Sequence, residues 1–140
     1  MITRVKLTAR RRFLGVLAYL GLVGIVRPQH SLSAPHDEQL ADSLARKLAA
    51  FSRQTTGARN VGREYLLHVP AENKPHVLVD LICATGGWRH AELANTDSAR
   101  LRVMLQDRIR RDFANGQVVN LHGWILSQTE TRLYALAALL

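Results

Sequence analysis

The stretch TDSARLRVMLQDRIRRDFA (96–114) decides the fold class, because its apolar residues recur at the spacing of a helix. Four apolar residues of this stretch stand four positions apart and define one face of an amphipathic helix, while arginines occupy the other faces. We predict that Thr96 caps the first turn and that Asn115-Gly116 ends the helix. The apolar face consists of Leu101, Leu105, Ile109 and Phe113.

Three further helices are expected before this stretch. Residues 37–52 carry apolar side chains at helical spacing. Residues 61–69 form a shorter apolar segment that contains Gly62, a residue unfavourable inside a helix. Residues 75–85 begin with a proline, which suits the first turn of a helix because the proline lacks an N–H group.

The segment QVVNLHGWIL (117–126) is apolar but too short for a helix. Its His122-Gly123 either turns a small hairpin or lies in an extended linker. Ser127 and Glu130 match a capping box, in which Ser127 caps a closing helix and Glu130 reaches back. We therefore predict an all-α fold, a small bundle of four to five helices with a possible hairpin or extended segment before the last one. The closing helix is expected to bury Leu133, Leu136, Ala137 and Leu140.

The first 33 residues have the composition of an export signal. Five basic residues and no acidic residue occur in the first twelve positions, and an apolar run follows at 13–26. As a helix this run is about 20 Å long, shorter than the roughly 30 Å hydrocarbon core of a membrane. We expect it to enter the membrane only transiently.

The arginines of this segment resemble a more specific signal. RRRFL (10–14) is similar to the twin-arginine (Tat) pattern of two arginines, one further residue and two apolar residues led by Phe. Ala9 replaces the usual Ser or Thr, and Gly15 replaces a frequent Lys. The resemblance implies export of a folded chain to the periplasm, with an ordinary secretory signal or an N-terminal anchor as the alternative. The Tat translocase would read Arg10, Arg11, Phe13 and Leu14.

The end of the signal is marked by small residues. Ser31 and Ser33 occupy the third and first positions before Ala34, and a cut after Ala34 would place Pro35 directly behind the bond. We expect cleavage before Ala34. The predicted organisation is a signal peptide at 1–33 and one helical domain at 34–140.

The formal charge of +8 belongs mostly to the signal. Six of the nineteen Lys and Arg residues lie in it without any acid, which leaves thirteen bases against eleven acids in the mature chain, a net +2. This balance argues against nucleic acid as a partner. A single cysteine, Cys83, excludes an internal disulfide.

No residue pattern indicates catalysis or a metal. The histidines show no pair at the spacing of metal ligands, so no metal or cofactor is predicted, although a site assembled from distant residues stays an alternative. Cys83 lies near a helix C-terminus, where the dipole disfavours a thiolate, and we interpret it as a buried thiol. Ser127 lacks the Gly-x-Ser-x-Gly motif of a nucleophile, and capping explains it. An enzyme is the least favoured class.

The arginine-rich helix and two tryptophans are the candidates for partner contact. The arginines form either a solvated face or a surface for an acidic partner, centred on Arg108 and Arg111. Trp88 and Trp124 lie in glycine-containing connections and are either partner anchors or lids on the core. We also assign Arg132 a partner-contacting or core-closing role.

The tail DFANGQVVNLHGWILSQTETRLYAL (112–136) resembles a recurring ending of small Tat-exported bacterial proteins to which no activity is attached. His122 stands where that ending has an acid. The matching positions are Gly116, Val118, Val119, Gly123, Trp124, Leu126, Ser127, Thr129, Glu130, Arg132, Leu133, Ala135 and Leu136.

The leader and the helical class are also similar to the small subunits of membrane-associated flavin dehydrogenases of the gluconate 2-dehydrogenase type. This resemblance implies an escort: a non-catalytic subunit that carries the signal and is exported with a larger redox enzyme. The alternative is a free-standing periplasmic module that binds a small ligand. The two differ in surface, because an escort needs an exposed apolar patch and a ligand module needs a concave pocket.

Overall fold

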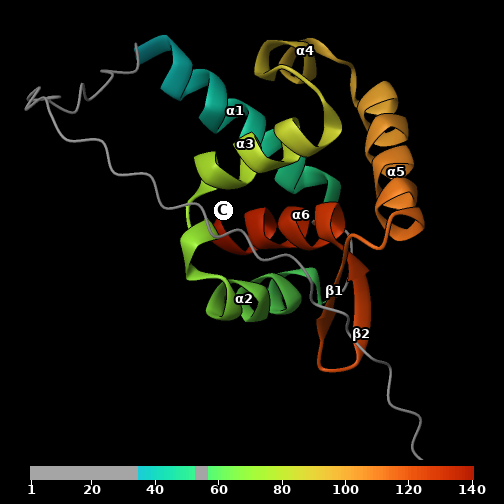
Figure 1. Cartoon of the computed structure of the whole chain (residues 1–140). Coiled ribbons are helices and arrows are strands. Elements are labelled where there is room, and N and C mark those ends of the chain that lie inside the picture. The colour runs from blue at the N-terminus through green and yellow to red at the C-terminus, as the bar shows by residue number, and fades with distance from the viewer. Residues whose placement is uncertain (1–34, 53–56) are drawn as a thin grey trace, which may run out of the picture. The chain divides into compact units, whose positions relative to one another are not determined.

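The computed structural model describes residues 35–52 and 57–140, with side chains from Glu38 onward. Within these ranges it has six α-helices, one 3-10 turn and a two-stranded antiparallel sheet (Figure 1). The predicted helical class is confirmed, but the fold is not purely all-α: the described residues form six α-helices rather than four to five, together with the hairpin that the prediction allowed before the last helix. The elements are α1 (Pro35–Ser52), α2 (Ala58–His68), η1 (Pro70–Glu72), α3 (Pro75–Gly86), α4 (His90–Asn95), α5 (Ser98–Ala114), β1 (Val118–Leu121), β2 (Trp124–Ser127) and α6 (Gln128–Leu139).

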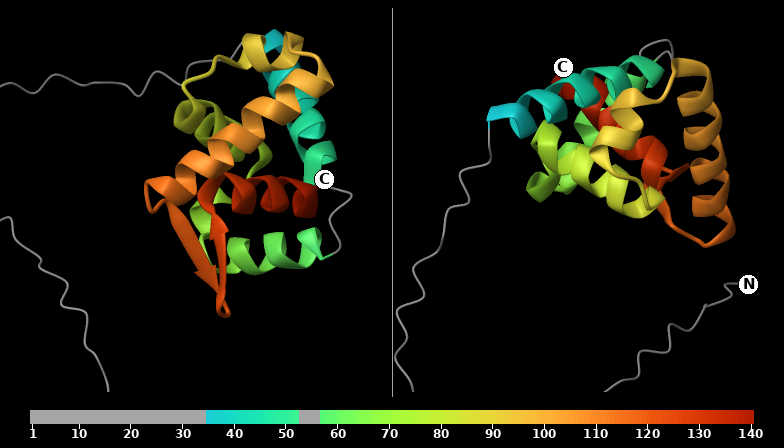
Figure 2. Two further views of the ribbon diagram at one scale, coloured as in Figure 1. Left: turned by 90° about the vertical axis from the view of Figure 1, so that its right-hand side faces the viewer. Right: turned by 90° about the horizontal axis from the view of Figure 1, so that it is seen from above.

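Helix α6 is the central element of the domain. It packs against α2 on one side and against α1 and α3 on the other, and α5 crosses near its start (Figures 1 and 2). Its predicted burial of Leu133, Leu136 and Ala137 is confirmed. The predicted burial of Leu140 is wrong, because this residue follows the last turn and is exposed.

Gly62 allows α2 to approach α6 closely. A Cβ at this position would lie 2.1 Å from the carbonyl oxygen of Tyr134, so only glycine fits the crossing. The residue that is unfavourable for a helix in isolation is therefore required for packing. The predicted helix is confirmed, and it begins at Ala58 rather than at residue 61.

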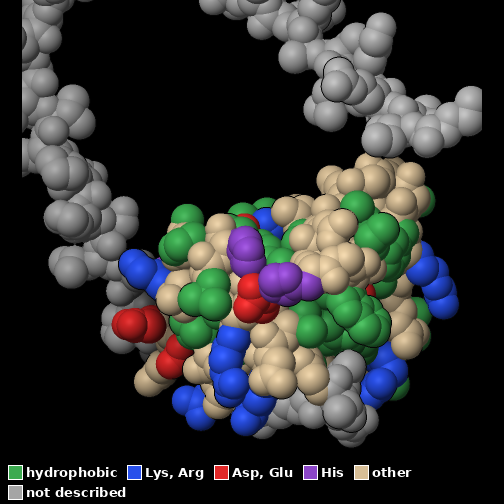
Figure 3. Space-filling view, turned by 90° about the horizontal axis from the view of Figure 1, so that it is seen from below, with side chains coloured by type: hydrophobic (Ala, Val, Ile, Leu, Met, Phe, Trp, Pro, Cys, Tyr) green, Lys and Arg blue, Asp and Glu red, His purple; other side chains and the backbone are tan. Residues whose placement is uncertain are grey.

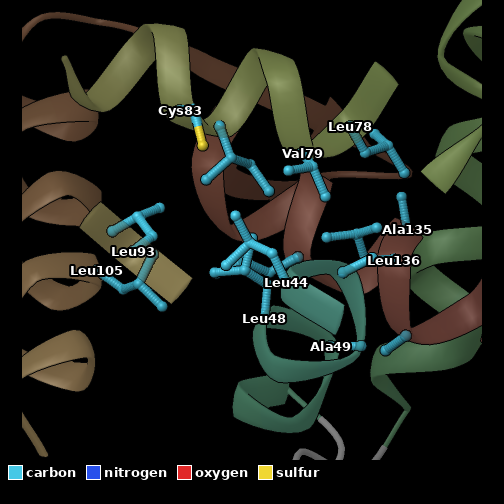
Figure 4. Packing of buried hydrophobic residues seen from close by; sticks show 14 of the residues in the cluster. Leu44, Leu48, Ala49, Leu78, Val79, Cys83, Leu93, Leu105, Ala135 and Leu136 are labelled. Carbon is cyan, nitrogen blue, oxygen red and sulfur yellow. The ribbon is translucent and has the colours of Figure 1, made fainter. Parts of the chain in front are cut away.

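The core lies between α1, α3, α4, α5 and α6 (Figure 4). Leucines from α1, α4 and α5 meet residues of α3 and α6 there, and Cys83 of α3 is buried among them. Burial and the negative charge of Asp80 raise the pKa of the Cys83 thiol to about 11. The interpretation of Cys83 as a buried, unreactive thiol agrees with this environment. The leucines are Leu44, Leu48, Leu93 and Leu105.

The start and the buried face of α5 differ from the prediction. Asp97, not Thr96, is the N-cap, and its Oδ1 accepts a hydrogen bond from the Arg100 N–H at 2.9 Å. Leu101 and Leu105 are buried as expected, but Phe113 is 46% exposed. The buried residue in the last turn is Asp112, because α6 begins beside it and supplies a donor for its carboxylate.

Helix α4 is the helix that the sequence pattern does not reveal. Six residues are too few for a helical period to stand out, and a helix of this length is marginal alone. Lys47 of α1 stabilises its C-terminal end, because the Nζ donates to the carbonyls of Leu93, Ala94 and Thr96. A cation at this position also interacts favourably with the helix dipole.

The predictions for the leader lie outside the described residues. They concern the translocase-recognition residues Arg10, Arg11, Phe13 and Leu14 and the cleavage residues Ser31, Ser33 and Ala34. Among the helices of residues 35–52 and 57–140, none combines the length and the apolar character needed to cross a membrane.

Candidate functional site

The hairpin of β1 and β2 is held in a defined shape by its turn. His122 and Gly123 both have positive φ, 51° and 87°, the geometry of the two-residue turns that suit the twist of a hairpin. The side chain of Asn120 accepts a hydrogen bond from the Gly123 N–H at 2.9 Å. The hairpin alternative for His122-Gly123 is thus the correct one.

The register of the hairpin places its apolar side chains on two faces. Leu121 pairs with Trp124 and Val119 pairs with Leu126, so these four side chains share one face. Ile125 and Val118 alternate with them and lie on the other face. Trp124 is 74% exposed and Ile125 is 60% exposed. Trp124 therefore does not cover the core.

A groove of about 540 Å³ lies between α2, the hairpin and α6. Its walls are mostly apolar, with a few polar groups at the rim. Figure 3 shows this side of the molecule, where hydrophobic side chains surround histidine and acidic side chains. The groove is lined by Gly57, Ala58, Asn60, Val61, Glu64, Leu121, His122, Trp124, Leu126 and Tyr134.

Two histidines hydrogen-bond to Glu64 at the rim of the groove, one to its carboxylate and one to its backbone carbonyl. His122 Nε2 donates to Glu64 Oε1 at 2.8 Å, which ties the hairpin turn to α2. His68 Nδ1 donates to the Glu64 carbonyl oxygen at 2.8 Å, and its ring meets that of His122 edge to face with centroids 6.3 Å apart. Within the described part of the chain, no group of three or more His, Cys, Asp or Glu residues is placed to hold a metal ion.

A buried ion pair connects α6 to the segment between α2 and α3. Arg132 donates to both oxygens of Glu72, from Nη2 at 3.0 Å and from Nε at 3.1 Å. Tyr65 donates to the same carboxylate at 2.7 Å, and Arg132 Nη1 donates to Thr85 Oγ1 at 3.2 Å. Arg132 is buried, and its guanidinium is hydrogen-bonded within the domain, which is the arrangement expected of the core-closing alternative.

The surroundings of this ion pair shift the pKa values of Glu72 and Tyr65. Burial raises the pKa of Glu72, but hydrogen bonds from Arg132 and Tyr65 and the charge of Arg132 outweigh burial and hold the pKa below its ordinary value. Burial and the neighbouring Glu72 carboxylate raise the pKa of Tyr65 to about 12. Glu72 is charged and Tyr65 is protonated at neutral pH, which is the state that the hydrogen bonds need.

The arginines proposed for partner contact have different surroundings. Arg108 is largely buried and donates to Asp112 at 2.8 Å and to the side chain of Gln117. Arg111 is exposed and pairs with Asp107 one turn away. Of the two, only Arg111 is accessible to a partner.

A second hollow lies between α4 and α5. It has a volume of about 600 Å³, is open to solvent and has a polar lining that includes Arg89, Glu92, Asp97 and Arg100. Both acids already accept hydrogen bonds from backbone N–H groups at the helix starts, Glu92 from Arg89 and Asp97 from Arg100. Its charges therefore serve local capping, and the groove beside the hairpin is the better defined candidate site.

Sequence reasoning identified Trp124 but not the rest of this groove. Its walls come from α2, the hairpin and α6, and the partners Glu64 and His122 are 58 positions apart. The three-residue spacing of Val61 and Glu64 indicates that they share one side of α2. Nothing in the sequence indicates that this side of α2 lies against the hairpin. Comparison with models of protein families, with curated proteins and with solved structures finds no match for this chain.

Proposed function

We propose that this chain is a non-catalytic accessory subunit, exported by the Tat pathway and bound in the periplasm to a larger redox enzyme. The observation that carries the proposal is the exposure of large apolar side chains on the hairpin and just before it in the chain. Among the described residues, seven large apolar side chains are exposed, and four of them lie between positions 113 and 125. They are Phe113, Val118, Trp124 and Ile125.

The face of the hairpin that carries Ile125 and Val118 is the surface assigned to the enzyme. Both side chains are exposed on the face opposite the groove. Each Å² of apolar surface removed from water gains roughly 25 cal/mol, so a partner that covers these side chains is favoured over solvent. A rigid hairpin also loses little conformational freedom on binding.

The leader supports the export part of the proposal. RRRFL (10–14) resembles the signal of a pathway that carries folded proteins, and a folded escort can bring a partner that has no signal of its own. The resemblance to small dehydrogenase subunits concerns the leader and the helical class, and it supports a redox enzyme as the partner.

The test is affinity purification of the tagged chain from its native periplasm. We expect a redox enzyme in stoichiometric amount, and its loss from the periplasm when Arg10 and Arg11 are both changed to Lys. Ile125→Ser should leave the chain in the periplasm and release the enzyme. Leu67→Ser is the matched control, because Leu67 is exposed on α2. Recovery of the unmodified chain without any enzyme would contradict the proposal.

A second candidate function, binding of a small ligand, is favoured by the groove. Its apolar walls and its Glu64 and His122 rim suit a small molecule with an apolar body and a polar end. Native mass spectrometry of the chain purified from the periplasm tests this function. A retained molecule of constant mass that is lost from the Trp124→Ala variant would support it, and a ligand-free spectrum would count against it.

A further inference from the structure

The lining of the groove between α2, the hairpin and α6 contains one acidic side chain, Glu64, and no lysine or arginine. We propose that the groove binds an organic ammonium compound, with its apolar body against the walls and its positive charge beside Glu64 and Trp124. This inference rests on the ligand-binding function and names the class of ligand. It is independent of the accessory function, which uses the Ile125 face of the hairpin.

The carboxylate of Glu64 keeps one oxygen for a ligand. Its Oε1 accepts the hydrogen bond from His122 Nε2 at 2.8 Å, and no group of the described residues donates to Oε2. The side chain of Glu64 is 34% exposed, so a ligand can reach it. Within the described part of the chain, its ion-pair contacts are with His68 and His122, and none is with a lysine or an arginine. Glu64 therefore offers a partly shielded acceptor to an incoming cation.

The position of this carboxylate relative to the apolar walls is fixed by the fold. The bond between His122 and Glu64 joins the hairpin turn to α2, and Gly62 brings α2 close to the backbone of Tyr134 in α6. The volume of about 540 Å³ falls within the range of roughly 300–1,000 Å³ that is typical of small-molecule sites. A small ligand therefore meets walls and a carboxylate that are already in place.

The aromatic side chains of the lining also favour a cation. Trp124 and Tyr134 both line the groove, and Trp124 is 74% exposed, so its indole has surface to offer a ligand. The face of an aromatic ring is electronegative and attracts cations, and tryptophan is the strongest of the three aromatic residues in this respect. Aromatic side chains recognise quaternary ammonium groups in this way. The indole and the Glu64 carboxylate thus select for the same charge.

An anionic ligand with a similar apolar body, such as a fatty acid, is disfavoured by the same groups. Its carboxylate would lie beside that of Glu64, and the proximity of like charges costs binding free energy. Arg63 follows Gly62 on α2, but it is exposed and does not line the groove. Its guanidinium donates to Asn60 Oδ1 at 3.3 Å. The lining therefore supplies no lysine or arginine to hold an anion.

Titration of the full chain with three probes that share one alkyl chain tests the proposal. Octyltrimethylammonium is cationic, 1-octanol is neutral and octanoate is anionic. Amide NMR spectra of the isotopically labelled chain are recorded at about pH 8, the upper end of the range in which histidine changes charge. We expect the cation to bind on the order of 10-fold more tightly than either other probe. The shifts should be largest at Val61, Glu64, His122 and Trp124, which locates the probe in the groove.

Variants separate the charge from the apolar walls. Glu64→Gln keeps an oxygen that can accept from His122, and it should weaken binding of the cation on the order of 10-fold without changing that of 1-octanol. Glu38→Gln removes the same charge from an exposed position of α1 outside the groove, and it should change neither. Trp124→Ala should weaken binding of the cation, and Leu67→Ala should not, because Leu67 is equally exposed but does not line the groove.

Two results would overturn the assignment of a cation. Octanoate or 1-octanol could bind as tightly as octyltrimethylammonium, or Glu64→Gln could bind the cation as the wild type does. In both cases binding to the groove persists, so the ligand-binding function would stand and only the class of ligand would be wrong. If none of the three probes binds, the inference and the ligand-binding function on which it rests are both contradicted.

Discussion

Asp112 Oδ2 accepts a hydrogen bond from the backbone N–H of Thr129 at 2.8 Å, which joins the last turn of α5 to the first turn of α6. Ser127 Oγ accepts the N–H of Glu130 at 2.9 Å, so two N–H groups at the start of α6 have side-chain acceptors. The expected cap by Ser127 is confirmed. The expected return contact of Glu130 is wrong, because its carboxylate accepts the Tyr134 hydroxyl at 2.6 Å instead.

We predict that Asp112→Ala lowers the free energy of unfolding by about 3–5 kcal/mol. The substitution removes an acceptor from the start of α6 and leaves the guanidinium of Arg108 largely buried without its partner. Urea denaturation measures the loss. The control is Asp107→Ala, whose ion pair with Arg111 is exposed and should contribute less than about 1 kcal/mol. Equal losses in the two variants would contradict the assignment.

The pair of Arg132 and Glu72 should show strong coupling in a double-mutant cycle. Arg132→Met and Glu72→Gln should each cost about 3 kcal/mol, because each leaves a polar or charged group buried without its partner. The double variant should cost less than the sum of the two, since neither charge then remains. Equilibrium unfolding of the four proteins gives the coupling energy. Additive losses would mean that the two side chains act independently.

The lowered pKa of Glu72 predicts part of the acid dependence of stability. Below the ordinary value of 4.5, the unfolded chain takes up a proton at this residue before the folded protein does. The contribution of Glu72 is therefore complete above that value and is lost as pH falls through the lowered folded pKa. Unfolding free energies from neutral pH to about pH 3 should converge for wild type and Glu72→Gln. A constant difference over this range would contradict the shift.

Gly62→Ala should destabilise the domain although alanine is the better helix former. Propensity alone predicts a gain of about 1 kcal/mol. The added Cβ would overlap the backbone of Tyr134, so α2 must move away from α6, and we expect a net loss of about 2 kcal/mol or more. Thermal unfolding compares this variant with Asn60→Ala on the exposed side of α2, which should be neutral or slightly stabilised. A gain for Gly62→Ala would show that the crossing is adaptable.

Local sequence patterns were sufficient to predict most of the helices, but they were insufficient to predict which helices contact one another. The apolar spacing of α5 and the cap at Ser127 depend on neighbours within a few positions, and both were predictable. Asp112, and not the expected Phe113, is the buried residue in the last turn of α5. This difference depends on α6, which begins fifteen positions after Phe113. A short helix such as α4 depends on Lys47, more than forty positions earlier.

The candidate groove was not predictable for the same reason. The sequence left Trp124 as either a partner anchor or a lid on the core, and it gave no indication of the opposite wall of the groove. Val61 and Glu64 reach the hairpin only because Gly62 brings α2 onto α6. Arg132 shows the converse case, since a charged residue of the tail is buried by a carboxylate sixty positions earlier.

The position of α6 in the chain has a consequence for biosynthesis. This helix fills the centre of the domain, yet it is the last of the described elements to leave the ribosome. Helices α1, α2 and α3 all pack against α6, so we expect much of their apolar surface to stay accessible to chaperones and proteases until residues 128–139 have been synthesised. We therefore expect folding of this domain to be completed only after translation of α6.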